Sequence, residues 1–187
     1  MNLTADKFIT AREEEKLLKT MSRFAAKGER AAIVDNMLFN LLALTGLRIS
    51  EALNLKWEDI GDDYILIHTP KSGRKTETVH IGRKLLELLA AFKESNPYAF
   101  SPYLFNTQKG PMKRTNAHER LKYWLKVASL RDSISCHSFR HTYATKCLDN
   151  GLDLAVVRDQ LRHSSVSITS VYLHFSQEKK EKLKEIF

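Results

Sequence analysis

The chain has 187 residues, which suits one domain or a domain with a small appendage. Its hydrophobic content of 43% is enough for a sizeable core, and 28% charged residues is ordinary for a soluble protein. Lys and Arg number 30 against 22 Asp and Glu, a surplus of +8 that favours polyanionic partners such as nucleic acid.

Cysteine use and hydropathy exclude two classes of protein. The two cysteines, Cys136 and Cys147, do not make a disulfide framework, so we interpret them as reduced thiols. No apolar run approaches the ~20 residues that a membrane-spanning helix needs, and the N-terminus lacks the apolar region of a signal peptide. We therefore expect a cytoplasmic protein with no membrane partner.

The first third of the chain is predicted to be helical. Thr10, with a glutamate three residues later, forms a capping box for a helix over residues 11–20. An apolar helix over residues 29–45 ends at Gly46, a residue suited to a left-handed C-cap. Another short helix follows through "RISEALNL", residues 48–55.

The segment "DYILIHTPKSGRKTETVHI", residues 63–81, has a different pattern. Side chains alternate up to Thr69, "PKSGRK" supplies turn chemistry, and extended character resumes from Thr76 to Val79. This pattern predicts a β-hairpin with a basic tip. Helical periodicity returns over residues 83–95, 115–128, 138–150, 153–162 and about 167–175. The predicted fold class is therefore α+β, mostly α-helical with a small antiparallel β-sheet.

The segment "SCHSFRHTYATKCL", residues 135–148, concentrates reactive side chains. Metal binding is one interpretation, because the segment contains Cys136, His137, His141 and Cys147. Their spacing matches none of the usual zinc patterns, which pair ligands two to five residues apart at both ends. The sequence therefore does not favour a metal site.

A packed helix is the second interpretation of the same segment. Phe139, Tyr143 and Cys147 recur every four residues, as a stripe that faces a core does. His137 and Arg140 lie three residues apart, side by side on another face of that helix. A pair of this kind can be structural or can bind an anion.

Three other segments add polar residues in patterns that suit anion binding. Arg48 follows the glycine cap near the start of a new helix, where its donors and the helix N-terminus both favour an anion, and Glu51 can hold its side chain in place. The alternative is a surface ion pair. The predicted hairpin tip is a solvated turn or a finger that brings cations to a nucleic-acid backbone. "LRHSSVSITSVYLHF" supplies His163 and Tyr172 as further polar residues. The alternative is structural: His163 as a helix cap and Tyr172 as a packing residue.

Taken in order, "TGLRISEALNL", the lysine-bearing turn, "HSFRHTYAT" and "LRHSSVSITSVYLH" resemble the catalytic domain of the tyrosine recombinases, or phage integrases. The resemblance runs from about Phe8 to His174. Each motif is modest alone, but four in the right order with the right separations are highly specific. The resemblance implies the DNA breaking-rejoining fold of that catalytic domain over residues 1–175, followed by a C-terminal tail at 176–187.

By this resemblance the six active-site positions of the family are filled, and Glu51 occupies the supporting acidic position. The six are Arg48, Lys71, His137, Arg140, His163 and Tyr172. Tyr172 would attack a DNA phosphodiester, form a 3′-phosphotyrosyl link and release a 5′-hydroxyl. Lys71 would protonate the leaving oxygen, and His137 would assist proton transfer at the tyrosine. A covalent intermediate conserves the bond energy, so we expect neither a metal nor a cofactor.

Partners are also implied by the resemblance. The substrate would be double-stranded DNA, contacted by Lys71, Arg74, Lys75, Lys113 and Arg114. Recombinases of this kind assemble on DNA, so we expect a monomer when free and a homo-oligomer, a tetramer in the synapse, when bound. The tail is either a frayed end or a segment passed to a neighbouring protomer. The expected location is the prokaryotic cytoplasm, in association with the nucleoid.

Two departures from the family pattern and two alternative functions accompany this prediction. Most members have a separate DNA-binding domain before this one, so the chain is expected to be an excised fragment or a short single-domain member. The family usually has glycine at the position of Arg162, which must either adopt a left-handed conformation, at a cost of roughly 1–2 kcal/mol, or end the helix differently.

The alternative functions are a type IB topoisomerase and a DNA-binding regulator that has the fold but does not cleave.

Overall fold

The computed structural model describes residues 4–68, 76–163 and 169–172, which form a mostly helical fold with two short antiparallel strand pairs. In chain order the elements are η1 (Ala5–Lys7), α1 (Ala11–Ala25), α2 (Arg30–Thr45), α3 (Ile49–Leu53), η2 (Trp57–Asp59), β1 (Tyr64–His68), β2 (Thr76–His80), α4 (Arg83–Ser95), β3 (Asn106–Thr107), β4 (Gly110–Pro111), α5 (Arg114–Val127), α6 (Cys136–Asp149) and α7 (Leu154–Leu161). Residues 169–172 form a further helical turn. The predicted fold class is confirmed.

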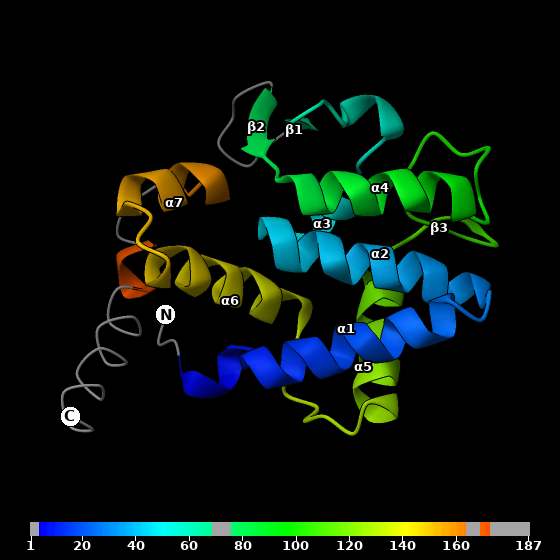
Figure 1. Ribbon diagram of the computed structural model, residues 1–187, viewed down its shortest axis with the longest axis horizontal. Helices are drawn as coiled ribbons and strands as arrows, with labels where there is room; N and C mark the ends of the chain where they lie inside the picture. The colour runs from blue at the N-terminus through cyan, green and yellow to red at the C-terminus, as the bar shows by residue number, and fades with distance from the viewer. Residues whose placement is uncertain (1–3, 69–75, 164–168, 173–187) are drawn as a thin grey trace.

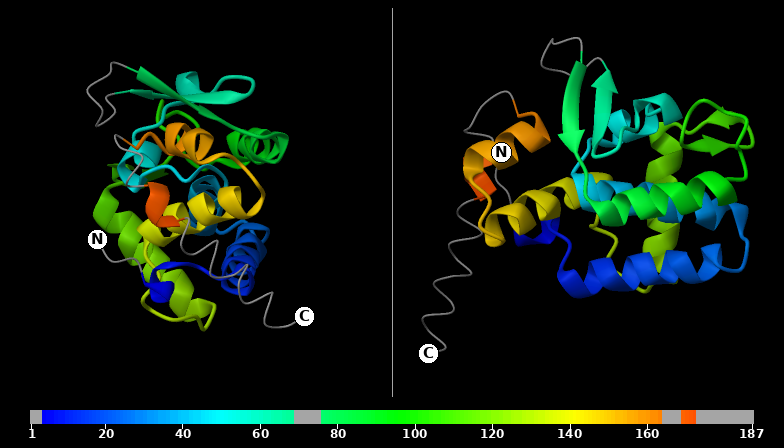
Figure 2. Two further views of the ribbon diagram at one scale, coloured as in Figure 1. Left: turned by 90° about the vertical axis from the view of Figure 1, so that its left-hand side faces the viewer. Right: turned by 45° about the horizontal axis from the view of Figure 1, so that its top comes forward.

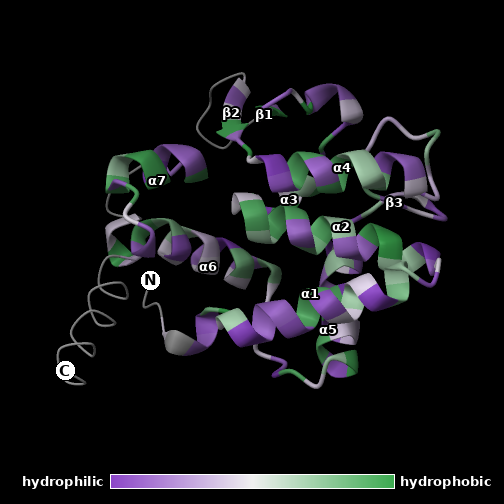
Figure 3. Cartoon of the chain, in the orientation of Figure 1, coloured by the Kyte–Doolittle hydropathy of each residue, from purple (hydrophilic) through white to green (hydrophobic). Residues whose placement is uncertain are grey.

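Helix α2 lies at the centre of the fold, between α1 and α4 (Figure 1), and also packs against α6. Its sequence, "RAAIVDNMLFNLLALT", is apolar on all sides, and a helix of that kind is stable only when it is buried. Leu38, Phe39 and Leu42 have no exposed surface. Figure 3 shows the contrast, because hydrophobic residues predominate along α2 whereas much of α1 is hydrophilic.

Helix α1 covers one side of α2 and begins at the predicted capping box. The backbone N–H of Thr10 donates to Glu13 Oε2 at 2.9 Å, and that of Glu13 donates to Thr10 Oγ1 at 3.2 Å. The helix continues to Ala25, beyond the predicted end at residue 20, because Met21 and Phe24 pack into the core. The helices predicted over 83–95, 115–128, 138–150 and 153–162 are confirmed within two residues at each end.

The predicted hairpin is present as the antiparallel pair β1–β2, which stands above α4 (Figure 2). Ile65 pairs with Val79, and both are fully buried against the helices. Gln160 of α7 fixes the far side of β2, because its side-chain amide accepts from His80 N at 3.1 Å and donates to His80 O at 2.7 Å. The predicted basic tip lies outside the described residues.

Helix α5 crosses the fold beside α1 and is joined to α2 by a buried polar contact. Asp35 of α2 is 2% exposed and accepts a hydrogen bond from Trp124 Nε1 at 2.7 Å and another from Arg120 Nε. Burial raises the pKa of Asp35, although the hydrogen bonds and the charge of Arg120 act in the opposite direction. The strand pair β3–β4 precedes α5; it was not predicted, because two residues per strand are too few to show an alternating pattern.

A second, smaller hydrophobic cluster lies between α6, α7 and the turn at 169–172. Its buried members are Ala144, Leu148, Val157, Leu161 and Tyr172. Tyr143 and Cys147 are half-buried and pack on this cluster, whereas Phe139 is buried in the main core and stacks on Phe39 with ring centroids 5.6 Å apart. The predicted apolar stripe on α6 therefore serves two clusters.

In the part of the chain that the structure describes, none of the helices is both long and apolar enough to cross a membrane.

Gly46, which ends α2, generates the first testable prediction. It has φ of 64°, and a Cβ placed there would lie 2.6 Å from Tyr143 Cδ1 and 2.8 Å from Leu161 Cδ2. Gly46→Ala should therefore lower the free energy of unfolding by about 2–4 kcal/mol, as strain from the left-handed backbone adds to overpacking. Denaturant unfolding measures the change.

Gly28→Ala is the matched control. Gly28 also has a left-handed φ, 79°, but a Cβ there meets nothing within 4 Å. It should therefore show the backbone strain alone, about 1 kcal/mol. Equal losses in the two variants would mean that the helix end does not pack against Tyr143 and Leu161 as described.

Candidate active site

Arg140 lies on α6 and is buried where two helices end. Its side chain is 2% exposed, because α6 packs directly against α2. The guanidinium donates from Nη1 to the carbonyl of Gly46, at 2.8 Å, and from Nη2 to the carbonyl of Leu161. These carbonyls belong to the C-terminal ends of α2 and α7, where the helix dipole is negative and stabilises a cation.

The charge of Arg140 persists despite this burial. Burial lowers its pKa to about 9, and the positive charges of Arg48 and Arg162 act in the same direction, so the side chain is still protonated at neutral pH. A guanidinium has five N–H donors, and the two carbonyls use two of them. The carbonyls leave the other three donors of the guanidinium unused.

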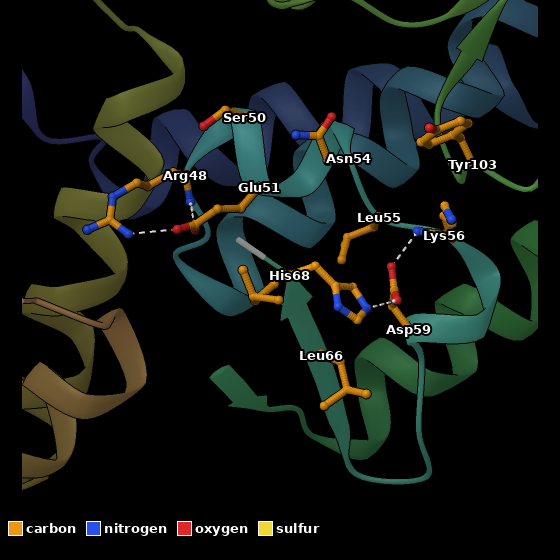
Figure 4. A pocket seen from close by; sticks show the side chains of 11 residues that line it. Arg48, Ser50, Glu51, Asn54, Leu55, Lys56, Asp59, Leu66, His68 and Tyr103 are labelled. Carbon is orange, nitrogen blue, oxygen red and sulfur yellow. Dashed lines mark hydrogen bonds and ion pairs between the residues drawn. The ribbon is translucent and has the colours of Figure 1, made fainter. Parts of the chain in front are cut away.

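Arg48 is the N-cap residue of α3, and its side chain reaches the end of α7. Its Nη1 lies 2.6 Å from Glu51 Oε1, and its backbone N–H donates to Glu51 Oε2 at 2.8 Å (Figure 4). Its Nη2 donates to the carbonyl of Arg162 at 3.3 Å. The Arg48 side chain is 22% exposed, so a ligand can reach it. The predicted pairing with Glu51 is confirmed.

Tyr172 and His163 face each other across the end of α7. Their rings stack with centroids 6.3 Å apart, and His163 Nδ1 is hydrogen-bonded to Thr169 Oγ1 at 2.8 Å. Tyr172 is 3% exposed, and its hydroxyl shares a hydrogen bond of 2.9 Å with His141 Nδ1. Burial raises the pKa of Tyr172, although the charge of Arg140 lowers it.

His137 is exposed and lies beside His141, with ring centroids 4.6 Å apart. Removal from water lowers the pKa of His141 to about 4 and that of His163 to about 3, and the charges of His137 and Arg140 add to both effects. His137 keeps an exposed edge, but partial loss of its hydration and the charges of Arg140, Arg48 and Arg114 also lower its pKa. Arg140 is therefore charged at neutral pH, while the imidazoles of the site favour the neutral form.

This arrangement can hold a tetrahedral anion beside a phenol. Two guanidiniums are fixed by backbone carbonyls and by a carboxylate, so they need no reorganisation when an anion arrives. Water is largely excluded from Arg140 and Tyr172, which strengthens any charge interaction made there. The geometry fits a phosphoryl group that a tyrosine hydroxyl could attack.

A pocket of about 260 Å³ adjoins Arg48 on the side of β1 (Figure 4). His68, at the end of β1, lies on its wall and holds Asp59 Oδ1 through Nε2 at 2.7 Å. Asp59 is buried and also accepts from the backbone N–H of Lys56 at 2.8 Å. The pocket therefore opens between Arg48 and the strand that leads to the predicted position of Lys71.

The structure brings together five of the six predicted active-site residues, Arg48, His137, Arg140, His163 and Tyr172, with Glu51 beside them. Lys71, Arg74 and Lys75 lie outside the described residues. Lys113 and Arg114 are exposed at the start of α5, and the charge of Arg114 reaches His137.

The cysteines do not contribute to this cluster. Cys136 is buried, and burial raises the pKa of its thiol to about 12, so it stays protonated. Its sulfur lies 3.8 Å from His118 Nδ1. Within the described ranges, no three His, Cys, Asp or Glu side chains are grouped as a metal site would require.

Two residues of the site were not predicted. His141 was considered only as a metal ligand, although its position four residues after His137 places it on the same helix face. Arg162 was noted as a departure from the family pattern, with two possible conformations. It has φ of 55° and ψ of 49°, so the left-handed alternative is the one observed.

Comparison with known proteins places this geometry in a family. Residues 7–179 match the model described as "Phage integrase family". A tyrosine recombinase of Agathobacter rectalis is 33% identical over 178 residues, and the tyrosine recombinase XerC of Leptospira interrogans is 32% identical over 181 residues. The matches cover 89% and 94% of this chain but 58% and 56% of the relatives, so the chain spans little more than half their length.

Solved structures share the fold. The XerA recombinase superposes with a TM-score of 0.78 at 22% identity, covering 95% of this chain and 63% of that one. XerH, bound to its palindromic difH substrate, gives a TM-score of 0.76 at 24% identity over 98% of this chain and 54% of that one. The fold is therefore that of a tyrosine recombinase catalytic domain. With the family match over nearly its whole length, the chain belongs to the phage integrase family.

The low pKa of His141 predicts a specific dependence of stability on pH. The unfolded histidine takes up a proton near its ordinary value of 6.5, while the folded one resists protonation down to about 4. The unfolded state then binds more protons, so stability falls as the pH is lowered through this window. Between pH 7.5 and 4.5 the loss from this residue should be about 2–3 kcal/mol.

His141→Gln isolates this contribution, because the carboxylates and the other histidines titrate in both proteins. The variant should lose less stability than the native chain over the same pH range in denaturant unfolding. Parallel curves for the two proteins would show that His141 is not held neutral by its surroundings.

Proposed function

We propose that this chain is the catalytic part of a site-specific recombinase that cleaves and rejoins DNA strands through a 3′-phosphotyrosyl intermediate. The observation that carries the proposal is the convergence of Arg48, Arg140 and Tyr172 at the end of α7. Relatives that cover most of the chain are named tyrosine recombinases, which supports the same activity.

The two guanidiniums would bind the scissile phosphate. Attack on a phosphodiester produces a pentacoordinate phosphorane with additional negative charge on its non-bridging oxygens. Arg48 and Arg140 would donate to those oxygens, and each donor held in place beforehand is worth roughly 3–4 kcal/mol in the transition state. The carbonyls at the ends of α2 and α7 fix one guanidinium, and Glu51 fixes the other.

His163 would add a further donor. Its low pKa keeps the imidazole neutral, and the Thr169 hydroxyl can donate to Nδ1. That hydrogen bond selects the tautomer with a proton on Nε2. His163 would then donate this N–H to the phosphorane without adding a charge to the site.

Tyr172 would be the nucleophile. Its oxygen forms the new bond to phosphorus, the bond from phosphorus to the 5′-oxygen breaks, and the phenolic proton must leave. His141 bonds the hydroxyl, and His137 lies directly beside it, so two neutral imidazoles are available to accept that proton. Lys71 would protonate the 5′-oxygen. The 5′-hydroxyl of a partner strand then reverses the step, which requires no metal or nucleotide.

Double-stranded DNA would be the substrate, contacted by Lys71, Arg74, Lys75, Lys113 and Arg114. XerH was solved bound to a difH substrate, and the Tn1549 transposon integrase in complex with transposon right end DNA, which supports DNA as the partner here. The active form would be a homo-oligomer on DNA, a tetramer in the synapse, with the tail at 176–187 passed between protomers. The protein would act on DNA in the bacterial nucleoid.

The first prediction of this proposal concerns covalent capture. A duplex with a nick close to the cleavage site should become linked to the native protein, because the short released strand diffuses away. Tyr172→Phe should form no adduct while it binds the duplex within about twofold of the native protein, since only the nucleophilic oxygen is lost. Denaturing gel electrophoresis of the reaction, run in EDTA, detects the adduct, and a binding titration with the same duplex gives the affinity.

Four outcomes would contradict parts of this scheme. An adduct that persists in Tyr172→Phe would place the nucleophile elsewhere. If the adduct forms only with added Mg²⁺ or Zn²⁺, a metal ion rather than the arginines would be the main stabiliser of charge. Relaxation of supercoiled DNA with no exchange between two sites would indicate a type IB topoisomerase, and binding with no adduct at all would indicate a regulator.

The second prediction separates the two arginines. Arg48→Ala should slow single-turnover cleavage by roughly a hundredfold or more and cost less stability than Arg140→Ala, because its side chain is partly exposed and Glu51 keeps its contact with Arg162. Arg140→Ala should slow cleavage by a similar factor and also lower the free energy of unfolding by about 2–5 kcal/mol, since two buried carbonyls lose their donor. Cleavage rates and unfolding curves of the two variants test this difference. If the cleavage rate of either variant falls only a few fold, that guanidinium does not contact the scissile phosphate.

A further inference from the structure

Arg162 has an unusual backbone conformation for a residue with a side chain. Among the described residues, left-handed φ values occur at Gly28, Gly46, Gly110 and Gly151 but at only two other residues, Ser129 and Arg162. Glycine fills the equivalent position at the end of α2, whereas α7 ends with an arginine at φ of 55°. Because any side chain is disfavoured in this conformation, the arginine is expected to contribute an interaction that glycine cannot.

The Arg162 side chain supplies that interaction to Glu51. It is 3% exposed, and its Nη2 lies 2.5 Å from Glu51 Oε2. The other carboxylate oxygen of Glu51 is 2.6 Å from Arg48 Nη1. One buried carboxylate is therefore held between two guanidiniums, one of which faces the proposed phosphate site.

Resting on the function proposed above, we propose that Arg162 is a positioning residue that fixes Glu51 and thereby holds Arg48 in the orientation that binds the scissile phosphate. Glu51 can hold Arg48 only if its own rotamer is fixed, and it is a flexible side chain on the short helix α3. Arg162 fixes it from the opposite side. The backbone carbonyl of Arg162 also accepts from Arg48 Nη2, so the residue contacts Arg48 both directly and through Glu51.

The electrostatics of Glu51 agree with this role. Burial acts to raise the pKa of Glu51, but the charge of Arg162 is the largest of the opposing effects, and with Arg48 it brings the pKa below the ordinary value. The carboxylate therefore remains ionised although the Glu51 side chain is only 9% exposed. Without Arg162, the pair formed by Arg48 and Glu51 would lose the contact that compensates for burial.

A second acidic residue connects the same arginine to the hairpin. Arg162 Nε lies 3.7 Å from Glu77 Oε2 on β2, too far for a hydrogen bond, and neither atom has another hydrogen-bond partner among the described residues. Gln160 also ties α7 to β2 through His80. The end of α7 therefore joins α3 to the strand that follows the predicted position of Lys71. The Arg162 guanidinium donates within the protein, to Glu51 and to the carbonyl of Gln160, which fits positioning rather than contact with DNA.

Arg162→Gly tests the proposal, because glycine suits the backbone conformation and removes only the side chain. Single-turnover cleavage of the nicked duplex should slow by tenfold or more, with the Kd for DNA within about threefold of the native value. Arg162→Lys, which keeps the charge but not the forked geometry, should recover part of the rate. Arg120→Ala is the matched control: it breaks the ion pair with Asp35, which lies eleven positions before the end of α2 at Gly46, and should leave the cleavage rate unchanged.

The decisive comparison is made in the Arg48→Ala background. If Arg162 acts through Arg48, adding Arg162→Gly there should slow cleavage by less than twofold. A slowdown that persists in full in that background, or a rate for Arg162→Gly within twofold of the native one, would overturn the proposal. Should Arg162→Gly fail to fold, Arg162→Lys takes its place in the same comparison, with an expected slowdown of about threefold that vanishes in the Arg48→Ala background.

The proposed function fails separately from this inference. If the native protein forms no covalent adduct, the recombinase proposal is wrong, and Arg162 has no phosphate-binding residue to position. If the native protein forms the adduct and Arg162→Gly forms it equally fast, only the inference is wrong.

Discussion

The site depends on one buried guanidinium placed between the ends of two helices. Arg140 is charged and almost inaccessible to water, a combination that is costly unless the charge finds partners. Its partners are the carbonyls of Gly46 and Leu161, which the helical hydrogen-bond pattern leaves free at the ends of α2 and α7. The same contact joins the C-terminal ends of the two helices through one side chain.

This arrangement explains why both helix ends have left-handed residues. A left-handed residue turns the chain sharply after the last helical turn. The last carbonyls of the helix are then free to accept from a neighbouring side chain. Gly46 does so for α2, where Tyr143 and Leu161 leave no room for a Cβ. Arg162 does so for α7, and its own carbonyl accepts from Arg48. Stability and proposed chemistry therefore share one set of contacts.

Local patterns in the sequence predicted the parts of the fold that are determined locally. The capping box at Thr10, the end of α2 at Gly46 and the pairing of Arg48 with Glu51 each involve residues at most four positions apart. The hydrogen bond from Tyr172 to His141 and the ion pair from Arg162 to Glu51 join residues 31 and 111 positions apart. Periodicity and propensity contain no information about such pairs. The family resemblance identified the predicted site residues, but not His141 or Arg162, whose roles follow from tertiary contacts.

The two halves of the site rest on different parts of the core. Arg48 and Arg140 are supported by the main core around α2, whereas Tyr172 belongs to the small cluster of α6 and α7. Among the described residues that cluster has five buried hydrophobic side chains, and one of them, Leu161, also supplies a carbonyl to Arg140. The proposed nucleophile and the buried guanidinium are therefore linked through the end of α7. For the proposed strand transfer this link is useful, because Tyr172 must reach a phosphate whose charge is stabilised throughout the reaction.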